Sequence, residues 1–289
     1  MLGLGSGVVY GGSIERTGFV YDFPGATAAF SLRRLASDES YAIRIRETGG
    51  NNEKDIGFNS SGDLDTSAIS SFCGSNDGVV TKWYDQSGPN HAVQADYDLQ
   101  PKIYDGSSVI EENSLPAIKF DESSLAMPSS VWEKGDISVF SVLSIRPAGS
   151  GTDSVAIQLS PDFINNEWAV VAIGNPPGNN FGSILYTDAT LRDKDTGAYT
   201  LGTQILSTTV SDVSTQTIDQ SIDGSDVSGD VPVPAAVDEM SLGSRREVSS
   251  DRAIDGTIQE VIIFSLAKNS TEQSDIESNI DSYYNIPGI

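Results

Sequence analysis

Short apolar segments separated by turn-forming residues run along most of this chain. Residues 43–46 read Ile-Arg-Ile-Arg, so apolar and charged positions alternate with the period of two that turns one side of a strand toward a core. Longer segments rich in β-branched residues have the composition and length of strands, and they cover residues 137–143, 168–173 and 205–210. This pattern predicts an all-β protein.

Turn chemistry marks where further segments end. Residues 216–224 read as a strand that enters an Asp-Gly turn, which predicts a hairpin at Asp223 and Gly224. Residues 231–234 read Val-Pro-Val-Pro. Each proline lacks the N–H that a sheet ladder requires, so we expect an edge or a loop there.

Two segments carry helical signals. Residues 65–72 predict one short helix with Asp65 as its N-cap. Residues 270–273 read Ser-Thr-Glu-Gln, a capping-box pattern, and apolar side chains recur after it at helical spacing, namely Ile276, Ile280, Tyr283 and Tyr284. No internal repeat of about 20–50 residues is present, so we do not expect a solenoid or a propeller.

The first 25 residues differ from the rest because they are rich in glycine. Residues 2–7 read Leu-Gly-Leu-Gly-Ser-Gly, and glycine loses more backbone entropy on ordering than any other residue. We expect residues 1–25 to form an extended assembly arm that docks onto a neighbouring subunit, with an arm folded back onto its own domain as the alternative. Residues 26–289 then form one domain, since all-β sandwiches of about 200–250 residues are commonly single domains.

The chain is strongly acidic, with 41 acidic and 17 basic residues among 289 and a net charge of −24. Such a chain repels nucleic acid and anionic membranes, because every phosphate contact needs a cation. The charge suits a basic partner, divalent cations, or a solvated surface typical of salty habitats. No apolar run approaches the 18 or so residues of a membrane span, so we expect no membrane insertion.

Two features bear on the compartment. The N-terminus lacks the basic region and the continuous apolar region of a signal peptide. Cys73 is the single cysteine, so an intramolecular disulfide is excluded. We therefore expect synthesis in the reducing cytoplasm of a host cell.

The most informative motif begins at residue 83. Residues 83–88 read Trp-Tyr-Asp-Gln-Ser-Gly, and Asn90, His91 and Gln94 follow. This phrase resembles the concanavalin-A-like sandwich domain of the α-L-arabinofuranosidase B family. Further segments resemble that family in the same order, and these are residues 29–35, 41–46, 54–58, 62–65, 115–121, 256–264 and the helix that ends at Tyr283 and Tyr284.

The resemblance covers roughly residues 26–286 and implies a fold. That fold is a concanavalin-A-like (jelly-roll) β-sandwich with a short C-terminal helix, here preceded by the extended N-terminal arm. Many bacterial surface proteins and bacteriophage virion proteins carry similar domains without being enzymes, so the resemblance alone does not imply an activity.

A sandwich of this type offers a sheet face and rim loops where aromatic rings stack on sugar rings and polar groups bind hydroxyls. The candidate carbohydrate-binding residues are Trp83, Tyr84, Asp85, Gln86, Asn90 and His91. In the alternative interpretation the motif is scaffold, because Trp83 and Tyr84 alternate across a strand and Asp85 caps its own turn. His91 is the single histidine and cannot form a zinc cluster alone.

No catalytic residues are expected. A retaining glycosidase needs two carboxyl groups roughly 5 Å apart. Where the resembled family has an acid after Leu-Gly-Ile-Gly-Gly, residues 242–247 read Leu-Gly-Ser-Arg-Arg-Glu, and only a shifted alignment would bring in Glu247. Where the family has its nucleophile, residues 168–175 contain no carboxylate. We therefore expect that the chain is not an enzyme.

One turn is rich in oxygen ligands. Asp223, Asp226 and Asp230 lie within eight residues of one another and could ligate Ca²⁺. The segment lacks the spacing and the terminal Glu of an EF-hand, so an ordinary hairpin turn is the alternative. We expect no other cofactor.

These interpretations together predict a non-enzymatic bacteriophage virion protein, displayed on a capsid as a decoration or on a tail, whose lectin-like sandwich aids attachment to host glycans. Its partners would be other virion proteins, reached through residues 1–25 in a homo-oligomeric or multi-copy assembly, and host-surface glycans. The alternatives are a free-standing carbohydrate-binding module and an arabinofuranosidase-like hydrolase.

Overall fold

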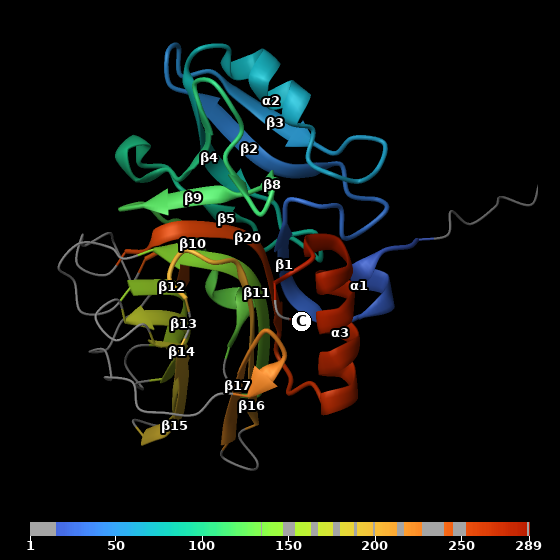
Figure 1. The fold of residues 1–289 in the computed structure, drawn as a ribbon, viewed down its shortest axis with the longest axis vertical. Helices are drawn as coiled ribbons and strands as arrows, with labels where there is room; N and C mark the ends of the chain where they lie inside the picture. Colours follow the sequence, from blue (N-terminus) through green and yellow to red (C-terminus); the bar gives the residue numbers. More distant parts are fainter. Residues whose placement is uncertain are drawn as a thin grey trace, which may run out of the picture.

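The computed structural model is a β-sandwich with a helix along one side (Figure 1). In the strands between residues 160 and 199 it describes the path of the backbone and not the side chains. The residues described are 16–133, 135–146, 154–162, 167–175, 180–187, 190–198, 200–212, 217–226, 240–244, 253–287 and 289. The predicted all-β class is confirmed.

The strands pair in antiparallel fashion throughout the described pairings, and one group is centred on β11 and β20. Strands β1 and β9 share the other edge of β20. In spatial order this group consists of β18 (Ser225–Asp226), β17 (Thr217–Ile222), β16 (Ile205–Asp212), β11 (Ile137–Arg146), β20 (Asp255–Phe264), and then β1 (Ala26–Ser31) and β9 (Ile118–Asp121).

From β9 the sheet continues into an upper part, which α2 (Thr66–Cys73) accompanies (Figure 1). Its strands, in spatial order, are β6 (Lys102–Asp105), β4 (Asp77–Trp83), β2 (Tyr41–Glu47) and β3 (Glu53–Gly57). A small hairpin of β7 (Glu111–Glu112) and β8 (Leu115–Pro116) precedes β9.

A further group starts from the end of β4 and leads to β14 and β15, which contact β17. Its strands are β5 (Ala92–Val93), β10 (Leu125–Met127), β19 (Met240–Leu242), β12 (Ser154–Asp162), β13 (Glu167–Asn175), β14 (Asn180–Thr187) and β15 (Thr190–Ala198). The strands expected around residues 43–46, 137–143, 168–173 and 205–210 are all present.

Strands β11 and β20 are buried on both faces, which explains their apolar composition. Val139 and Leu143 of β11 belong to the main core. Phe140 and Val142 alternate with them and belong to a second core beneath α3 (Ser270–Tyr284). A strand covered on both faces has no need for a polar side, so apolar side chains occupy both sets of alternating positions.

The two longer helices confirm the sequence prediction, with one shift. Asp65 caps α2 by accepting a hydrogen bond from the Ala68 amide at 3.0 Å. The capping box of α3 begins at Asn269, because its side chain accepts from the Glu272 amide while the Glu272 carboxylate accepts from the Asn269 amide at 3.0 Å. No helix in the described part of the chain is long and apolar enough to cross a membrane.

The predicted hairpin after β17 is present. Asp223 and Gly224 have φ angles of 49° and 71°, the positive values that tight hairpin turns require at both central positions. The Val-Pro segment at residues 231–234 lies outside the described residues.

Part of the predicted arm belongs to the domain instead. Residues 16–25 include the short helix α1 (Phe19–Asp22), and Phe19 is 3% exposed in the core beneath α3. The Val20 amide donates to the Leu35 carbonyl at 3.1 Å, which fixes α1 against its own sandwich. For these residues the alternative of an arm folded back holds, and residues 1–15 lie outside the described part.

Candidate functional site

Asp85, in the turn that leaves β4, ties that turn to β1. Its carboxylate accepts hydrogen bonds from the amides of Ala29 at 2.9 Å, Ser87 at 2.8 Å and Asn90 at 3.0 Å. The residue is 1% exposed. The carboxylate therefore holds the turn and β1 together and offers nothing to a ligand in solvent.

Gln86 does the same for the segment after β1. Its side-chain oxygen accepts from the Leu35 amide at 2.7 Å, and its nitrogen donates to the carbonyls of Ser31 at 3.1 Å and Arg33 at 2.9 Å. The residue is 2% exposed. All polar groups of this amide are thus used to shape residues 31–35.

Trp83 and Asn90 also serve the scaffold. Trp83 is 0% exposed and packs against Phe30, with ring centroids 5.9 Å apart. The Asn90 side chain donates to the Thr27 carbonyl at 2.8 Å and accepts from the Ser130 hydroxyl at 2.7 Å. The expectation that Trp83, Asp85, Gln86 and Asn90 contact a glycan is therefore corrected, because their side chains are used within the protein.

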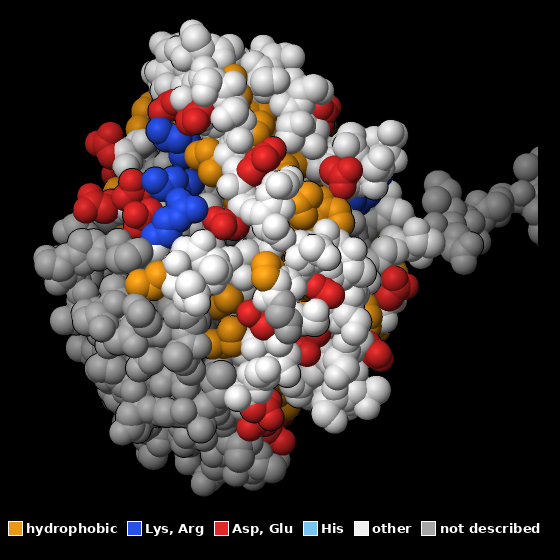
Figure 2. Space-filling model, viewed as in Figure 1, with side chains coloured by type: hydrophobic (Ala, Val, Ile, Leu, Met, Phe, Trp, Pro, Cys, Tyr) orange, Lys and Arg blue, Asp and Glu red, His pale blue; other side chains and the backbone are white. Residues whose placement is uncertain are grey.

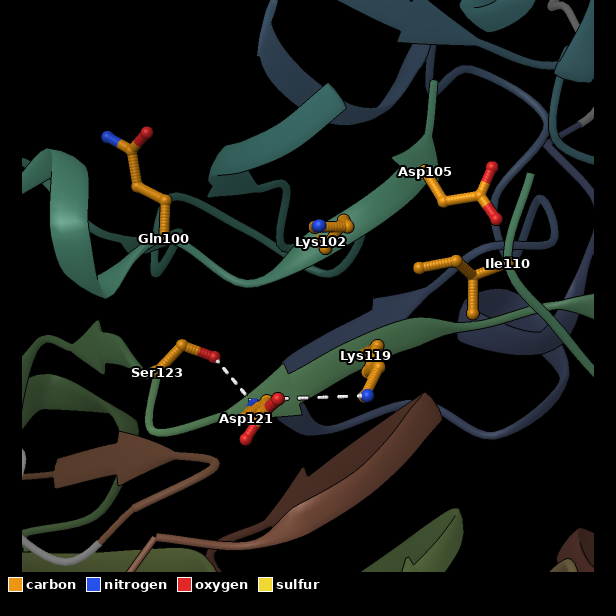
Figure 3. Close-up of a pocket in the computed structure, with 7 residues that line it drawn as sticks. All are labelled: Gln100, Lys102, Asp105, Ile110, Lys119, Asp121 and Ser123. Atoms are coloured by element: carbon orange, nitrogen blue, oxygen red, sulfur yellow. Dashed lines mark hydrogen bonds and ion pairs between the residues drawn. The ribbon is translucent and has the colours of Figure 1, made fainter. Parts of the chain in front are cut away.

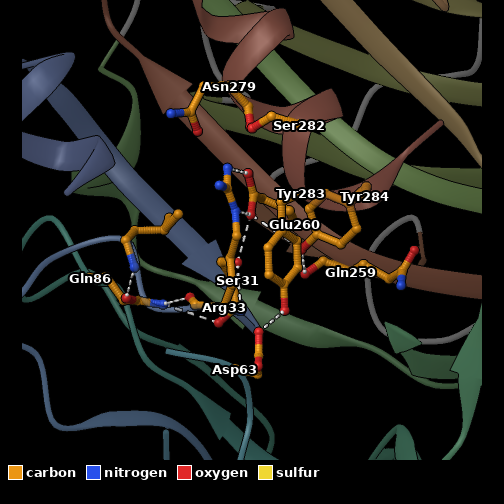
Figure 4. A network of polar contacts seen from close by, with 11 residues as sticks. Ser31, Arg33, Asp63, Gln86, Gln259, Glu260, Asn279, Ser282, Tyr283 and Tyr284 are labelled. Carbon is orange, nitrogen blue, oxygen red and sulfur yellow. Dashed lines mark hydrogen bonds and ion pairs between the residues drawn. The ribbon is translucent and has the colours of Figure 1, made fainter. Parts of the chain in front are cut away.

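The segment that Gln86 shapes carries a buried ion pair (Figure 4). Arg33 donates from Nε and Nη2 to the two oxygens of Glu260 at 2.8 and 2.9 Å, and Glu260 is 0% exposed. Ser31 and Tyr284 donate their hydroxyls to the same carboxylate at 2.6 and 3.2 Å. Burial alone would lower the pKa of Arg33, but the charge of Glu260 outweighs it and raises this pKa, so the guanidinium stays charged.

Tyr84 and His91 are the aromatic residues of the motif that stay partly exposed. Together with Tyr41 they form a group that we call the aromatic face. The ring centroids of Tyr41 and Tyr84 lie 5.8 Å apart, and those of Tyr84 and His91 lie 5.0 Å apart. Tyr41 is 46% exposed, and Lys82 Nζ lies 5.2 Å from the centre of the Tyr84 ring.

Burial, neighbouring charges and hydrogen bonds determine the protonation states of Tyr84 and His91. Burial, together with a hydrogen bond to Asp55 at 2.7 Å, raises the pKa of Tyr84 to about 12, so its hydroxyl stays protonated. Burial and the charge of Lys82 lower the pKa of His91. His91 Nδ1 accepts from the Asp85 amide at 3.1 Å, so the neutral ring carries its proton on Nε2.

The sequence did not reveal a second candidate site, a pocket between β6 and β9 with a volume of about 370 Å³ (Figure 3). Its lining combines two cations, two carboxylates and uncharged groups, and consists of Gln100, Lys102, Asp105, Ile110, Lys119, Asp121 and Ser123. The only local signal is the outward position of Lys102 and Lys119 beside buried Ile103 and Ile118. The pocket itself arises from long-range pairing of the two strands.

The two lysines of this pocket have different surroundings. Lys102 Nζ lies 2.6 Å from an Asp77 oxygen. Lys119 Nζ lies 3.7 Å from Asp121 and 3.9 Å from Asp255, distances too long for hydrogen bonds. Figure 2 shows basic side chains gathered in the region of β9 and bordered by acidic ones.

The carboxylate of Asp105 at the rim is fixed and ionised. It accepts from the amide of Ser108 at 2.8 Å and from the amide and hydroxyl of Ser107 at 3.0 and 2.8 Å. These bonds, that of the Ser108 amide first, lower the pKa of Asp105 to about 2. The pocket therefore presents both signs of charge at neutral pH.

The remaining sequence candidates lie partly outside the described residues. Residues 245–252, including Glu247, are not described, and nor are the side chains of residues 168–175. Asp223 accepts from the Leu206 amide at 2.8 Å, Asp226 is exposed, and Asp230 lies outside the described residues. No group of three potential metal-ligating side chains occurs in the described part, and the Ca²⁺ site stays a prediction.

No family model matches the chain, and no curated protein matches it. Solved structures do match. A GH54 α-L-arabinofuranosidase soaked with a cyclic sulfate inhibitor has a TM-score of 0.61 and 14% identity over 91% of this chain and 65% of that chain. An arabinofuranosidase complexed with arabinofuranosyl-α-1,2-xylobiose has a TM-score of 0.61 and 15% identity, with 91% and 64% covered. A Trypanosoma rangeli sialidase with sialic acid has a TM-score of 0.47 and 14% identity, with 70% and 31% covered.

The two arabinofuranosidase similarities confirm the sandwich fold and correct one expectation. Nearly the whole chain has the fold of a glycoside hydrolase, which overturns the expectation that it is not an enzyme. That expectation rested on the sequence at residues 168–175 and 242–247, most of whose side chains lie outside the described residues. The chain spans 65% of the length of the arabinofuranosidase, and at this identity the likeness shows the fold alone.

Proposed function

We propose that this protein recognises carbohydrate and that the aromatic face is a contact surface for the sugar. The observation that carries the proposal is the 46% exposed ring of Tyr41 beside the partly exposed rings of Tyr84 and His91. The fold supports it, since a protein of the same fold has been solved in complex with an arabinofuranosyl-xylobiose.

The chemistry of the face suits a sugar ring. An exposed tyrosine ring presents an apolar surface to the C–H groups of a sugar, and the polar groups at its edge can bind hydroxyls. His91 Nε2 supplies a donor, because Nδ1 already accepts from the turn. Lys82 supplies a cation next to Tyr84, and Tyr84 is held in place by Asp55.

The test is a glycan array followed by calorimetry on the glycans that bind. Tyr41→Ala should weaken binding at least about tenfold, about 1.4 kcal/mol, because aromatic anchors carry a large share of binding energy. Tyr97→Ala is the matched control, since Tyr97 is 56% exposed but stacks on Arg46 outside the aromatic face. Release of reducing sugar, measured in the same reactions, shows whether recognition is coupled to hydrolysis.

Two results would count against this proposal. One is an array on which a correctly folded protein binds no glycan. The other is equal loss of affinity in the Tyr41 and Tyr97 variants, which would place the contact elsewhere. Unchanged thermal unfolding of both variants guards against misfolding as the cause.

The setting that we propose for this recognition is a bacteriophage particle, on its capsid or tail. What supports it is the resemblance of the sequence motifs to sandwich domains of virion proteins. Residues 16–25 already pack on the sandwich, so the proposed contact with other virion proteins is limited to residues 1–15. Mass spectrometry and immunogold labelling of purified particles test this setting, and a chain found only in the unassembled fraction would argue against it.

A further inference from the structure

Three cations lie in one row across the upper sheet. Arg46 of β2 is paired with Val79 of β4, Val79 with Lys102 of β6, and Lys102 with Lys119 of β9. Residues directly opposite one another on neighbouring strands share a face of the sheet. Like charges placed opposite one another destabilise a sheet, and here carboxylates of Asp77, Asp121 and Asp255 lie within 4 Å of the two lysine ammonium groups.

The three cations are not equally available. Arg46 already donates to Gln100 at 2.8 Å and to Asn51 at 2.5 Å, and its guanidinium lies 4.0 Å from the centre of the Tyr97 ring. Lys102 is engaged by Asp77 at 2.6 Å. Within the described part of the chain, Lys119 donates no hydrogen bond. Its ammonium, on a side chain that is 34% exposed, makes only the long ion pairs to Asp121 and Asp255, so its N–H groups stay available to a ligand in the pocket.

The surrounding carboxylates restrict which anion can enter. Asp105 and Asp121 line the pocket, and Asp77 and Asp255 lie behind the two lysines. Four negative charges around two positive ones, on a chain of net charge −24, repel a multiply charged sulfate or phosphate polymer. A ligand with one carboxylate meets less of this repulsion than a multiply charged one, and direct contact with Lys119 together with hydrogen bonds donated to the aspartates offsets it.

We propose that this pocket binds an acidic sugar, with the carboxylate of a uronic acid residue at Lys119 and its hydroxyls directed to Asp121 and Asp105. Ser123 supplies a further polar group at one side, and Ile110 supplies the apolar contact. The inference rests on carbohydrate recognition as the proposed function and names the class of sugar. The pocket is distinct from the aromatic face, because Lys102 pairs near the start of β4 whereas Tyr84 follows its end.

The experiment uses the full chain and the methyl glycosides of galacturonic, glucuronic and guluronic acid, which carry one carboxylate each, and each is also tested as its methyl ester. Calorimetry should detect binding of at least one free acid and at least tenfold weaker binding of its ester, because esterification removes the charge that Lys119 contacts. Lys119→Gln should weaken binding of the acid about tenfold or more and leave the ester unaffected, since a hydrogen bond to a charged group is lost. Lys54→Gln, an exposed lysine of β3, is the control for net charge and should leave both ligands unchanged.

The outcomes separate this inference from the proposed function. Failure of all three acids to bind, equal affinity for acid and ester, or equal effects of the Lys119 and Lys54 variants would overturn the pocket proposal. Binding of neutral glycans on the array that Tyr41→Ala abolishes would then still support recognition at the aromatic face. Competition by inorganic sulfate at the affinity of the uronate would also overturn the proposal, because it would show a general anion site.

Discussion

Replacing Glu260 by Gln tests whether the buried ion pair holds the sandwich and α3 together. The wild-type carboxylate accepts four hydrogen bonds, two from Arg33 and one each from Ser31 and Tyr284. The glutamine side chain has the same shape but only one acceptor oxygen, and its NH₂ group would face donors. The substitution therefore leaves the Arg33 cation without a counter-charge at a site where Glu260 is 0% exposed.

Breaking a buried pair in this way costs about 3–5 kcal/mol, because one charge stays buried and uncompensated. This is a large part of the roughly 5–15 kcal/mol by which a domain is stable. Urea unfolding followed by tryptophan fluorescence measures the loss, since buried Trp83 and Trp132 report on the core. Asp38→Asn is the matched control, because the side chains of the Arg16–Asp38 pair are 66% and 40% exposed and its loss should lower the stability far less.

A double variant makes the argument refutable. Arg33→Met combined with Glu260→Leu removes both charges and should recover most of the lost stability, as replacing buried pairs by apolar groups often does. The reasoning fails if Glu260→Gln costs less than about 1 kcal/mol. It also fails if the double variant is as unstable as the sum of its single changes, because the two side chains would then be uncoupled.

Two further predictions follow from the structure. Burial and Lys82 lower the pKa of His91, so the unfolded chain takes up this proton first as the pH falls below 6.5. An NMR titration of this single histidine should give a midpoint below pH 6.5. Wild type should lose stability between pH 7 and pH 5, and His91→Gln should lose less. A midpoint at or above 6.5 would contradict the lowered pKa. Deleting residues 1–15 should leave thermal unfolding unchanged, whereas deleting residues 1–22 should cost about 3–5 kcal/mol, because it also removes buried Phe19. Equal transitions for the two deletions would show that α1 does not support the core.

Sequence patterns within a few residues were enough to predict the long strands and one hairpin. Strand periodicity located β11 and β16, and turn chemistry located the hairpin at Asp223. The helix α1 was missed, because four residues in a glycine-rich segment carry no helical period, and its position depends on Phe19 entering a distant core. The cap of α3 was placed one residue late, since Asn269 and Ser270 are both good N-caps and only the backbone decides between them.

The candidate site was harder to predict for a physical reason. The turn at residues 83–88 reads as a cluster of sugar-binding side chains, yet burial and backbone partners supplied by β1 convert most of them into scaffold. The pocket, in contrast, is a candidate site that no local sequence motif indicates. Its two lysines are 17 positions apart in sequence, Lys102 and Lys119, and nothing in either neighbourhood indicates that their strands pair. Contacts between strands far apart in sequence bury the turn and form the pocket, and such contacts cannot be inferred from sequence periodicity.

Many of the family-like motifs meet in one network of polar contacts, which explains why the resemblance predicts the fold and not the ligand. Five of the eight motifs contribute a member to the network in Figure 4, namely Ser31 and Arg33, Asp63, Gln86, Glu260, Tyr283 and Tyr284. Residues that close a buried polar network are constrained by the fold, because a single unpaired member is costly. They therefore report on architecture, which agrees with a TM-score of 0.61 at 14% identity. Specificity must come from side chains outside this network, and Tyr41 and Lys119, both directed to solvent, are the positions where a change should alter the ligand and leave the fold intact.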